Sequence, residues 1–242
     1  GEGIPVKYIS PVNEPFWVWN GGQEGCHYRP SSCRKVLRAF VKELDDRKTL
    51  DGVRLSGCEN GDIRWFNKSY SRAVLGDPLV RTRLGALDIH SYCLHMPIPF
   101  FNNRMSFLKR FAKWMSKNYP DVPVNMSEWT HMQGGRDKGM DSALVTANVM
   151  YEDLSVLNVI SWQHWIAVSE VNYCDGLIYI NLDDKTFEMT KRYYVTGNFS
   201  KYVPTGSVRV DAACDDPELR LLAFKYDGGC AVIVINSTEK EK

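Results

Sequence analysis

Lys7-Tyr8-Ile9-Ser10-Pro11-Val12-Asn13-Glu14-Pro15 is a short strand-like run that ends on polar side chains. Tyr8 and Ile9 supply its apolar part, and the proline directly after Glu14 stops a strand from continuing. Trp17 follows within a turn, so a titratable acid lies beside an aromatic face that can stack on a sugar ring. The stretch therefore indicates a strand end that presents Asn13 and Glu14 to a sugar site, although a single glutamate at a strand end is more often a solvated loop charge.

A second stretch repeats this order of residues. Val122-Pro123-Val124-Asn125-Met126-Ser127-Glu128-Trp129 is again an apolar strand followed by a carboxylate and then an aromatic residue. Two such strand ends would bring Glu14 and Glu128 to one rim, and a pair of carboxylates is what glycoside hydrolysis requires.

Strand patterns alternate with helix patterns along most of the chain. Strands are predicted near residues 6–9, 53–59, 84–92, 123–127 and 159–163. Helices are predicted from a cap at Ser32 to Leu44, and over residues 65–75, 103–118, 143–157 and 193–202. This alternation is typical of an α/β protein with a parallel sheet.

The candidate functional residues all lie where predicted strands end. They are Asn13 and Glu14, then Glu59, then His90 and Tyr92, then Glu128, and last Trp162 with Gln163. In a closed eight-stranded barrel, functional side chains gather at the carboxyl ends of the strands. An open doubly wound sheet is the alternative, but the sequence has no glycine-rich phosphate loop that would favour it.

The last part of the chain changes to short alternating runs. Apolar segments at 207–210, 221–224 and 231–235 are separated by turns, and Asp227-Gly228-Gly229 is typical of a hairpin. We expect a small antiparallel β unit here.

These motifs resemble glycoside hydrolase family 30, which belongs to the clan of retaining (β/α)8-barrel glycosidases. The run 9–15, continued by Trp17, Trp19 and Gln23-Glu24-Gly25-Cys26, is similar to the acid/base segment of that family, and 126–129 to its nucleophile segment. The resemblance extends from about residue 5 to the end. It implies strands four to eight of a (β/α)8 TIM barrel in residues 1–204, followed by the start of an antiparallel β-sandwich in residues 205–242. Strands one to three would then be missing, and an incomplete barrel has open edges and an unfilled interior.

The resemblance also implies roles for the site residues. Glu14 would be the acid/base and Glu128 the nucleophile of a double displacement, with His90 and Tyr92 as hydrogen-bond donors. Asn13 would bind the sugar 2-hydroxyl, or else shape the turn. Tryptophans 17, 129, 162 and 165 would line the sugar site, although a tryptophan after a strand is more often core. Glu59 is a further acid at the rim and a candidate contact to a substrate hydroxyl.

Composition narrows the class of partner. The chain has 242 residues and a formal net charge of +1, so no overall field would recruit nucleic acid or an anionic membrane. No apolar run approaches the ~20 residues of a membrane-spanning helix, and no signal peptide is visible. The seven cysteines form no CxxC pair, which argues against a metal site, and no cofactor is expected. From the family, an extracellular or periplasmic location is expected.

Two rival functions stay open. One is a carbohydrate-binding or degenerate homologue without turnover, which would have no need of both Glu14 and Glu128. The other is a metal-dependent deacetylase that uses His90, His95 and Glu59 and would lose activity on chelation. For the hydrolase, the loop that contains Gln23 to Cys26 is most similar to that of β-1,6-galactanases, which favours galactan or arabinogalactan, with xylan or β-glucan next.

Overall fold

A computed structural model describes residues 3–20, 25–47, 52–93, 96 and 102–242 of the chain. The backbone forms two compact units. The first comprises Gly1–Trp129 with Val156–Gln163, and the second comprises Thr130–Ser155 with His164–Lys242. The domain boundary that the sequence analysis places between residues 204 and 205 stays a prediction.

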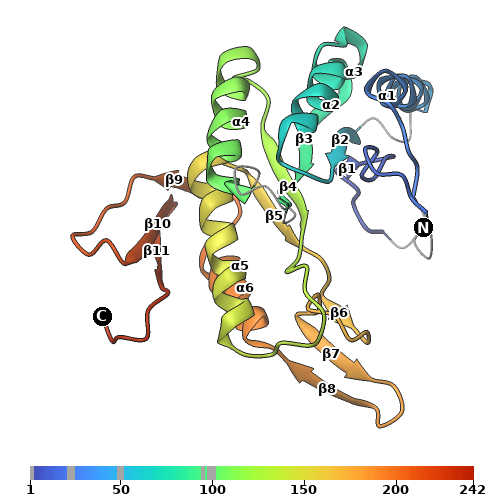
Figure 1. Cartoon of the computed structure of the whole chain (residues 1–242). Helices are drawn as coiled ribbons and strands as arrows, with labels where there is room; N and C mark the ends of the chain where they lie inside the picture. Colours follow the sequence, from blue (N-terminus) through green and yellow to red (C-terminus); the bar gives the residue numbers. More distant parts are fainter. Residues whose placement is uncertain (1–2, 21–24, 48–51, 94–95, 97–101) are drawn as a thin grey trace. The chain divides into compact units, whose positions relative to one another are not determined.

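A five-stranded sheet organises the first unit (Figure 1), and its strands lie in chain order, β1-β2-β3-β4-β5. Their bounds are Tyr8–Ile9, Arg54–Asn60, Leu84–His90, Val124–Trp129 and Ser161–His164. Parallel pairing joins β1 to β2, β2 to β3 and β3 to β4. The predicted parallel sheet is therefore confirmed, and its curled form with helices between the strands is that of a partial (β/α) barrel.

In the described residues, the connections from β1 to β4 contain the helices α1 (Pro30–Asp46), α2 (Trp65–Leu75), α3 (Pro78–Arg83) and α4 (Arg104–Asn118). The predicted cap at Ser32 is wrong, because α1 begins at Pro30, whose ring already holds the helical φ angle at the first turn. The sequence analysis missed α3, where Asp77 accepts hydrogen bonds from the backbone amides of Leu79 and Val80.

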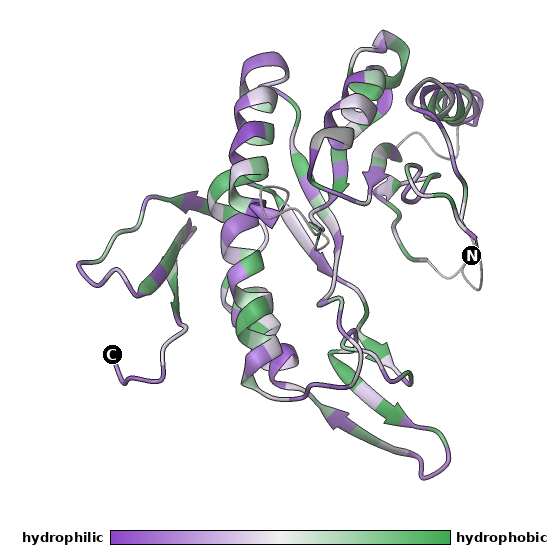
Figure 2. Ribbon diagram, in the orientation of Figure 1, coloured by the Kyte–Doolittle hydropathy of each residue, from purple (hydrophilic) through white to green (hydrophobic). Residues whose placement is uncertain are grey.

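Helix α4 confirms its prediction closely. Asn103 caps it by accepting a hydrogen bond from the amide of Ser106. Its buried residues, Phe107, Leu108, Phe111 and Met115, follow the three- and four-residue spacing of one helix face. Figure 2 shows the resulting alternation of hydrophobic and hydrophilic bands along the helix.

The second unit contains α5 (Met140–Glu152), which continues as a π-helix over Asp153–Leu157, and α6 (Lys191–Tyr202). Its first sheet has the order β6-β7-β8, with bounds Val168–Ser169, Ile178–Asn181 and Thr186–Met189. The sequence analysis missed this sheet, because two- and four-residue strands are too short to show a clear period.

An antiparallel sheet closes the chain, in the order β11-β10-β9, with bounds Gly229–Asn236, Leu219–Tyr226 and Val208–Val210. Tyr226 pairs with Gly229 across the predicted hairpin, and Gly228 has a φ of 84°, which a glycine adopts without strain. The antiparallel unit is confirmed, whereas its place in a β-sandwich stays a prediction.

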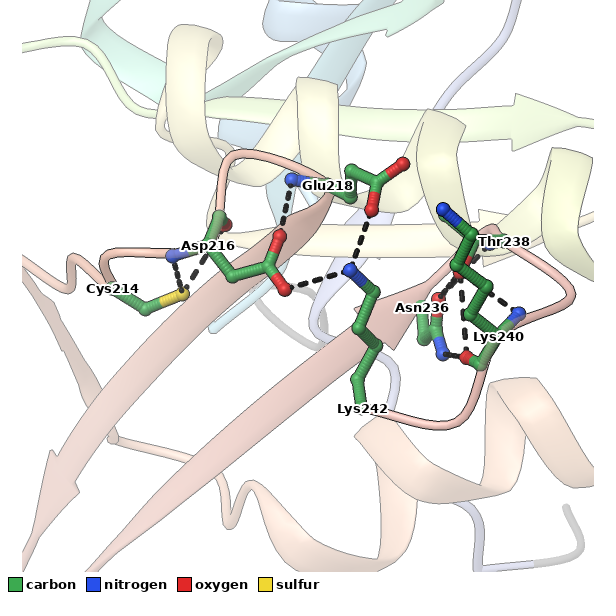
Figure 3. Close-up of polar contacts among 7 residues, drawn as sticks. All are labelled: Cys214, Asp216, Glu218, Asn236, Thr238, Lys240 and Lys242. Atoms are coloured by element: carbon green, nitrogen blue, oxygen red, sulfur yellow. Dashed lines mark hydrogen bonds and ion pairs between the residues drawn. The ribbon is translucent and has the colours of Figure 1, made fainter.

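Polar contacts hold the final residues against this sheet (Figure 3). Lys242 Nζ lies 2.9 Å from Asp216 Oδ2 and also pairs with Glu218. Asn236 accepts a hydrogen bond from the amide of Thr238 at 2.9 Å and donates to the carbonyl of Lys240 at 2.8 Å. The tail is therefore ordered by side chains of β11 and of the loop before β10. Within the described part of the chain, none of the helices is long and apolar enough to cross a membrane.

Candidate active site

Neighbouring strands of the first unit bring four ionisable side chains to one edge of the parallel sheet. Glu14 follows β1, Glu59 lies near the end of β2, His90 ends β3 and Glu128 lies in β4. His90 is the register partner of Glu128. The carboxyl ends of parallel strands meet at one edge, which is why residues far apart in sequence converge here.

His90 lies between three carboxylates. Its Nδ1 is 2.8 Å from Glu14 Oε1 and 3.6 Å from Glu128 Oε1, and its Nε2 is 3.2 Å from Glu59 Oε2. Burial opposes protonation of this ring, which is 1% exposed. Hydrogen bonds to Glu14 and Glu59 and the negative charges of Glu128 and Glu59 outweigh burial and raise the pKa of His90 to about 9. At neutral pH, His90 is therefore an imidazolium that donates from both nitrogens.

The carboxylates of Glu14 and Glu128 share one gap, because an oxygen of each lies within 4.8 Å of the other. The Glu14 side chain is held by its backbone, whose φ of 41° is in the left-handed region and whose amide donates to the Glu59 carbonyl at 2.9 Å. Retaining glycosidases place their two carboxyl groups about 5–5.5 Å apart, and inverting ones about 6.5–9.5 Å apart. Two carboxyl groups this close can approach the same atom of a substrate.

Glu128 has the two predicted donors, since Tyr92 donates its hydroxyl to Glu128 Oε1 at 3.3 Å and His90 is its cationic neighbour. Burial nevertheless raises the pKa of Glu128, and the charges of Glu14 and Glu59 add to this effect, while His90 and the Tyr92 hydrogen bond oppose it. Glu128 therefore ionises at a higher pH than a free glutamate.

Glu59 faces the interior of the site. It is 9% exposed, and its Oε2 accepts hydrogen bonds from Ser127 Oγ and from His90. Burial alone would raise the pKa of Glu59, but the hydrogen bonds of His90 and Ser127 and the charge of His90 lower it. The predicted contact of Glu59 with a substrate hydroxyl stays a prediction, since Oε2 already has protein partners.

Of the predicted aromatic residues, Trp17 lies beside Glu14, whereas the sugar platform of Trp129 and Trp162 stays a prediction. The rings of Trp129 and Trp162 lie 6.1 Å apart at 47°. Trp17 Nε1 and Glu14 Oε1 flank Gly61 so closely that a Cβ there would lie 2.6 Å from each. Trp165 belongs to the second unit, and its part in the platform stays a prediction. Asn13 is exposed, directly before Glu14.

Sequence analysis missed a buried polar layer beneath these residues. Asn125 donates to Asp88 Oδ1 at 2.8 Å, and Ser127, two residues further along β4, reaches Glu59. The signal was available, because Asp88 and His90 in β3, like Asn125 and Ser127 in β4, are polar residues at alternate positions of their strands. Gly61, in the predicted Asn60-Gly61 turn, was likewise not assigned to the site.

One group of side chains in the described residues has the spacing of a cation site. Ligand atoms of Glu14, His90 and Glu128 lie within 4.8 Å of one another. A metal that bound here would have to displace the proton that the raised pKa of His90 keeps on the ring at neutral pH. His95, which the deacetylase alternative requires, lies outside the described residues.

The segment that contains Glu128 also carries a match to a known family. Residues 101–179 match the sequence profile of O-glycosyl hydrolase family 30. Over this segment the chain is similar to glycoside hydrolase family 30. The chain is also 24% identical over 200 residues to the lysosomal acid glucosylceramidase of Mus musculus. The aligned region covers 74% of this chain and 36% of the mouse protein.

Several solved structures share the fold of this chain. A conserved exported protein from Bacteroides fragilis has a TM-score of 0.82 at 19% identity, over 99% of this chain and 56% of that protein. A family 30 endoxylanase from Clostridium papyrosolvens has a TM-score of 0.71 at 17% identity, over 97% of this chain and 51% of the endoxylanase. An endo-β-1,6-glucanase has a TM-score of 0.73 at 21% identity, over 100% of this chain and 54% of the glucanase. The chain therefore spans about half the length of these proteins.

Proposed function

We propose that the protein is a retaining β-glycoside hydrolase that cleaves oligo- or polysaccharides by double displacement. The observation that carries this proposal is the separation of Glu14 and Glu128, whose oxygens lie within 4.8 Å across one gap. The match of residues 101–179 to O-glycosyl hydrolase family 30 and the likeness to a glucosylceramidase support it.

In the first step, a carboxylate oxygen of Glu128 attacks the anomeric carbon while Glu14 protonates the leaving oxygen, so the glycosidic bond breaks as the glycosyl-enzyme bond forms. Oε1 of Glu14 already accepts from His90, which leaves Oε2 to carry the proton. In the second step, Glu14 takes a proton from water, the hydroxyl oxygen attacks the same carbon, and Glu128 leaves as a carboxylate. Two inversions restore the starting configuration.

His90 would serve both steps through its charge. The imidazolium lies 2.8 Å from Glu14 and 3.6 Å from Glu128, so it offsets the repulsion between the two carboxylates whenever both are ionised. Asn13 would donate to the 2-hydroxyl of the sugar, while Trp129 and Trp162 would form the apolar floor under the ring.

For the substrate, we propose β-1,6-galactan or arabinogalactan first, and xylan or β-glucan next. The first choice rests on the loop that contains Gln23 and Glu24, which lie outside the described residues. The second choice is supported by the fold shared with an endoxylanase and with an endo-β-1,6-glucanase.

We further propose that the active protein includes three more barrel strands before β1 and a complete sandwich after β11. The larger size of the proteins that share the fold supports this, since the chain covers only 51–56% of them. Export from the cytoplasm is proposed from the likeness to the exported Bacteroides protein. Assays therefore use the full-length protein that carries this chain.

The proposal is tested by incubating the protein with arabinogalactan, β-1,6-glucan, xylan and aryl β-glycosides and measuring the size of the products. Proton NMR immediately after cleavage gives the anomeric configuration of these products. We expect β-configured products to appear first and then to mutarotate. Initial α products would contradict the retaining mechanism. Binding of one of these sugars without any cleavage would instead favour the carbohydrate-binding alternative.

A further inference from the structure

Glu59 is a buried acid of the site that the mechanism above does not use. Its Oε2 lies 3.2 Å from His90 Nε2 and also accepts a hydrogen bond from the hydroxyl of Ser127. Side chains of β3 and β4 therefore fix one carboxylate oxygen of this β2 residue. Burial alone would raise the pKa of Glu59, but these hydrogen bonds and the charge of His90 lower it, so Glu59 is ionised at neutral pH.

Glu59, His90 and Glu14 form a closed ring of contacts. The backbone amide of Glu14 donates to the carbonyl of Glu59 at 2.9 Å. The side chain of Glu59 reaches His90 Nε2 at 3.2 Å, and the other nitrogen of that imidazole, Nδ1, lies 2.8 Å from Glu14 Oε1. The ring joins the ends of three neighbouring strands, β1, β2 and β3. A shift of Glu59 would therefore displace His90, Glu14 or both.

The backbone of Glu59 has a conformation that a glutamate rarely adopts. Its φ of 54° lies in the left-handed region, where a side chain is strained. Glu14, the proposed acid/base, shares this property with a φ of 41°. Such strain persists only where the surrounding contacts hold the backbone, and it is concentrated at functional sites. The strained backbone therefore points to a task for the Glu59 carboxylate in the site.

Three carboxylates and one phenol face His90. They are Glu14 after β1, Glu59 on β2, Glu128 on β4, and Tyr92, whose ring centroid lies 6.1 Å from that of His90. In the double displacement, two of these carboxylates lose their charge in turn, because Glu14 is protonated before the first step and Glu128 is an ester in the glycosyl-enzyme. Glu59 takes part in neither change. Of the three carboxylates, it is therefore the one that stays beside His90 as an anion throughout the reaction.

We propose that Glu59 is a positioning residue of the active site: its carboxylate holds the imidazole of His90 through Nε2, so that Nδ1 stays directed at Glu14. A buried carboxylate that orients a histidine in this way is known from the Ser-His-Asp triad, where it fixes both the ring and its charge. Here the oriented histidine serves a carboxyl group rather than a serine hydroxyl. The effect on turnover rests on the proposed function, whereas the hold of Glu59 on His90 does not.

The hold of Glu59 on His90 is tested without any activity measurement, by 15N NMR of the histidine side chains in the full-length protein. The resonances of His90 are identified by their loss in His90→Gln. In the wild type they should titrate near pH 9. Glu59→Gln keeps the shape of the side chain but removes its charge, and should lower this midpoint by at least about one pH unit. Glu43→Gln, which removes an exposed carboxylate of α1, is the control and should leave the midpoint in place. An unchanged midpoint in Glu59→Gln overturns the proposal.

The effect on turnover is tested with an activated aryl glycoside, whose good leaving group needs no proton from Glu14. Glu59→Gln should lower kcat by about tenfold with little change in KM, the effect of weakening one hydrogen bond to a charged group. The alkaline limb of kcat should move to lower pH together with the NMR midpoint of His90. A higher KM with kcat and its alkaline limb unchanged would mean that Glu59 binds the substrate instead, and overturns the positioning role.

Glu59→Asp is a second variant that should fold, because aspartate tolerates a left-handed φ and keeps the charge. Its shorter side chain reaches His90 less closely, so the NMR midpoint and kcat should both lie between those of the wild type and of Glu59→Gln. Wild-type values of both in the two variants overturn the proposal. If the midpoints shift as expected but the wild type cleaves no glycoside, the proposed function fails and the hold of Glu59 on His90 stands.

Discussion

His90 and Glu14, which lie 76 residues apart in the sequence, are joined by a 2.8 Å contact between Nδ1 and Oε1. The contact is buried, and the same ring lies within 3.6 Å of Glu128 and 3.2 Å of Glu59. One cation therefore organises three carboxylates, and each of the predictions about activity below follows from a change in that arrangement.

Replacement of the two proposed catalytic acids should have different effects. Glu128→Gln should lower kcat by about 10⁴-fold or more on every substrate, because an amide cannot form the glycosyl-enzyme bond. Glu14→Gln should mainly slow substrates with poor leaving groups, since good ones depart without protonation. The effects of both substitutions are measured as rates of hydrolysis of a series of aryl glycosides. Wild-type rates for Glu128→Gln on an activated glycoside would contradict the assignment.

His90→Gln should shift the acid limb of the pH profile. The charge of His90 lowers the pKa of Glu128, so a neutral amide in its place leaves that pKa higher still. Glu128 must be ionised to attack, and the acid limb of kcat/KM should therefore move to higher pH. Tyr92→Phe, which removes the hydroxyl 3.3 Å from Glu128, should move it in the same direction. If the acid limb of kcat/KM stays at the same pH in both variants, ionisation of Glu128 does not determine that limb.

Folding stability should fall between pH 6.5 and 9. The pKa of His90 is 6.5 in the unfolded chain and about 9 in the folded one, so its contribution is complete below pH 6.5 and is lost as pH rises through 9. The change is about 3 kcal/mol. Urea unfolding across this window should show a smaller decline for His90→Gln than for the wild type. Parallel declines would mean that His90 is not protonated in the folded state.

Gly61→Ala should damage the site without unfolding the protein. A Cβ at this position would lie 2.6 Å from Glu14 Oε1 and from Trp17 Nε1, so the acid must move. A displacement of about 1 Å can lower the rate by about 10²-fold. The matched control is Gly134→Ala, whose Cβ would meet nothing within 4 Å. The two variants are compared by steady-state kinetics and by thermal melting. Equal kcat values for Gly61→Ala and Gly134→Ala would contradict this prediction.

Arg192 should be essential to the stability of the second unit. The side chain is completely buried and donates to the carbonyls of Asp137 and Gly176 and to the hydroxyls of Ser142 and Tyr179. Arg192→Met would leave these acceptors without their donor, so we expect a loss of about 3–5 kcal/mol in the free energy of unfolding.

The control for Arg192 is its neighbour Lys191→Met on the exposed face of α6, which should change the free energy of unfolding by less than about 0.5 kcal/mol. Chemical denaturation of both variants provides the measurement. Similar losses in the two would show that charge, rather than the buried hydrogen bonds, is responsible.

Periodicity and strand-end residues were sufficient to predict the parallel sheet, the bounds of α4 and the convergence of Glu14 with Glu128. These predictions rest on local sequence patterns. Alternating apolar residues indicate strands, apolar residues at three- and four-residue spacing indicate helices, and a carboxylate directly after a strand indicates a functional strand end. The short helix α3 and the strands β6 to β8 were missed, because elements of two to six residues contain too few positions for a period to appear.

By itself, the sequence determined which residues reach the carboxyl edge of the sheet, because a strand's end and its side-chain alternation are local properties of the chain. Only the tertiary structure decided what those residues do to one another. The proton on His90 and the raised pKa of Glu128 depend on distances between separate strands and on burial from water. The energy of a charge is set by its whole surroundings, and those surroundings exist only after the strands have paired.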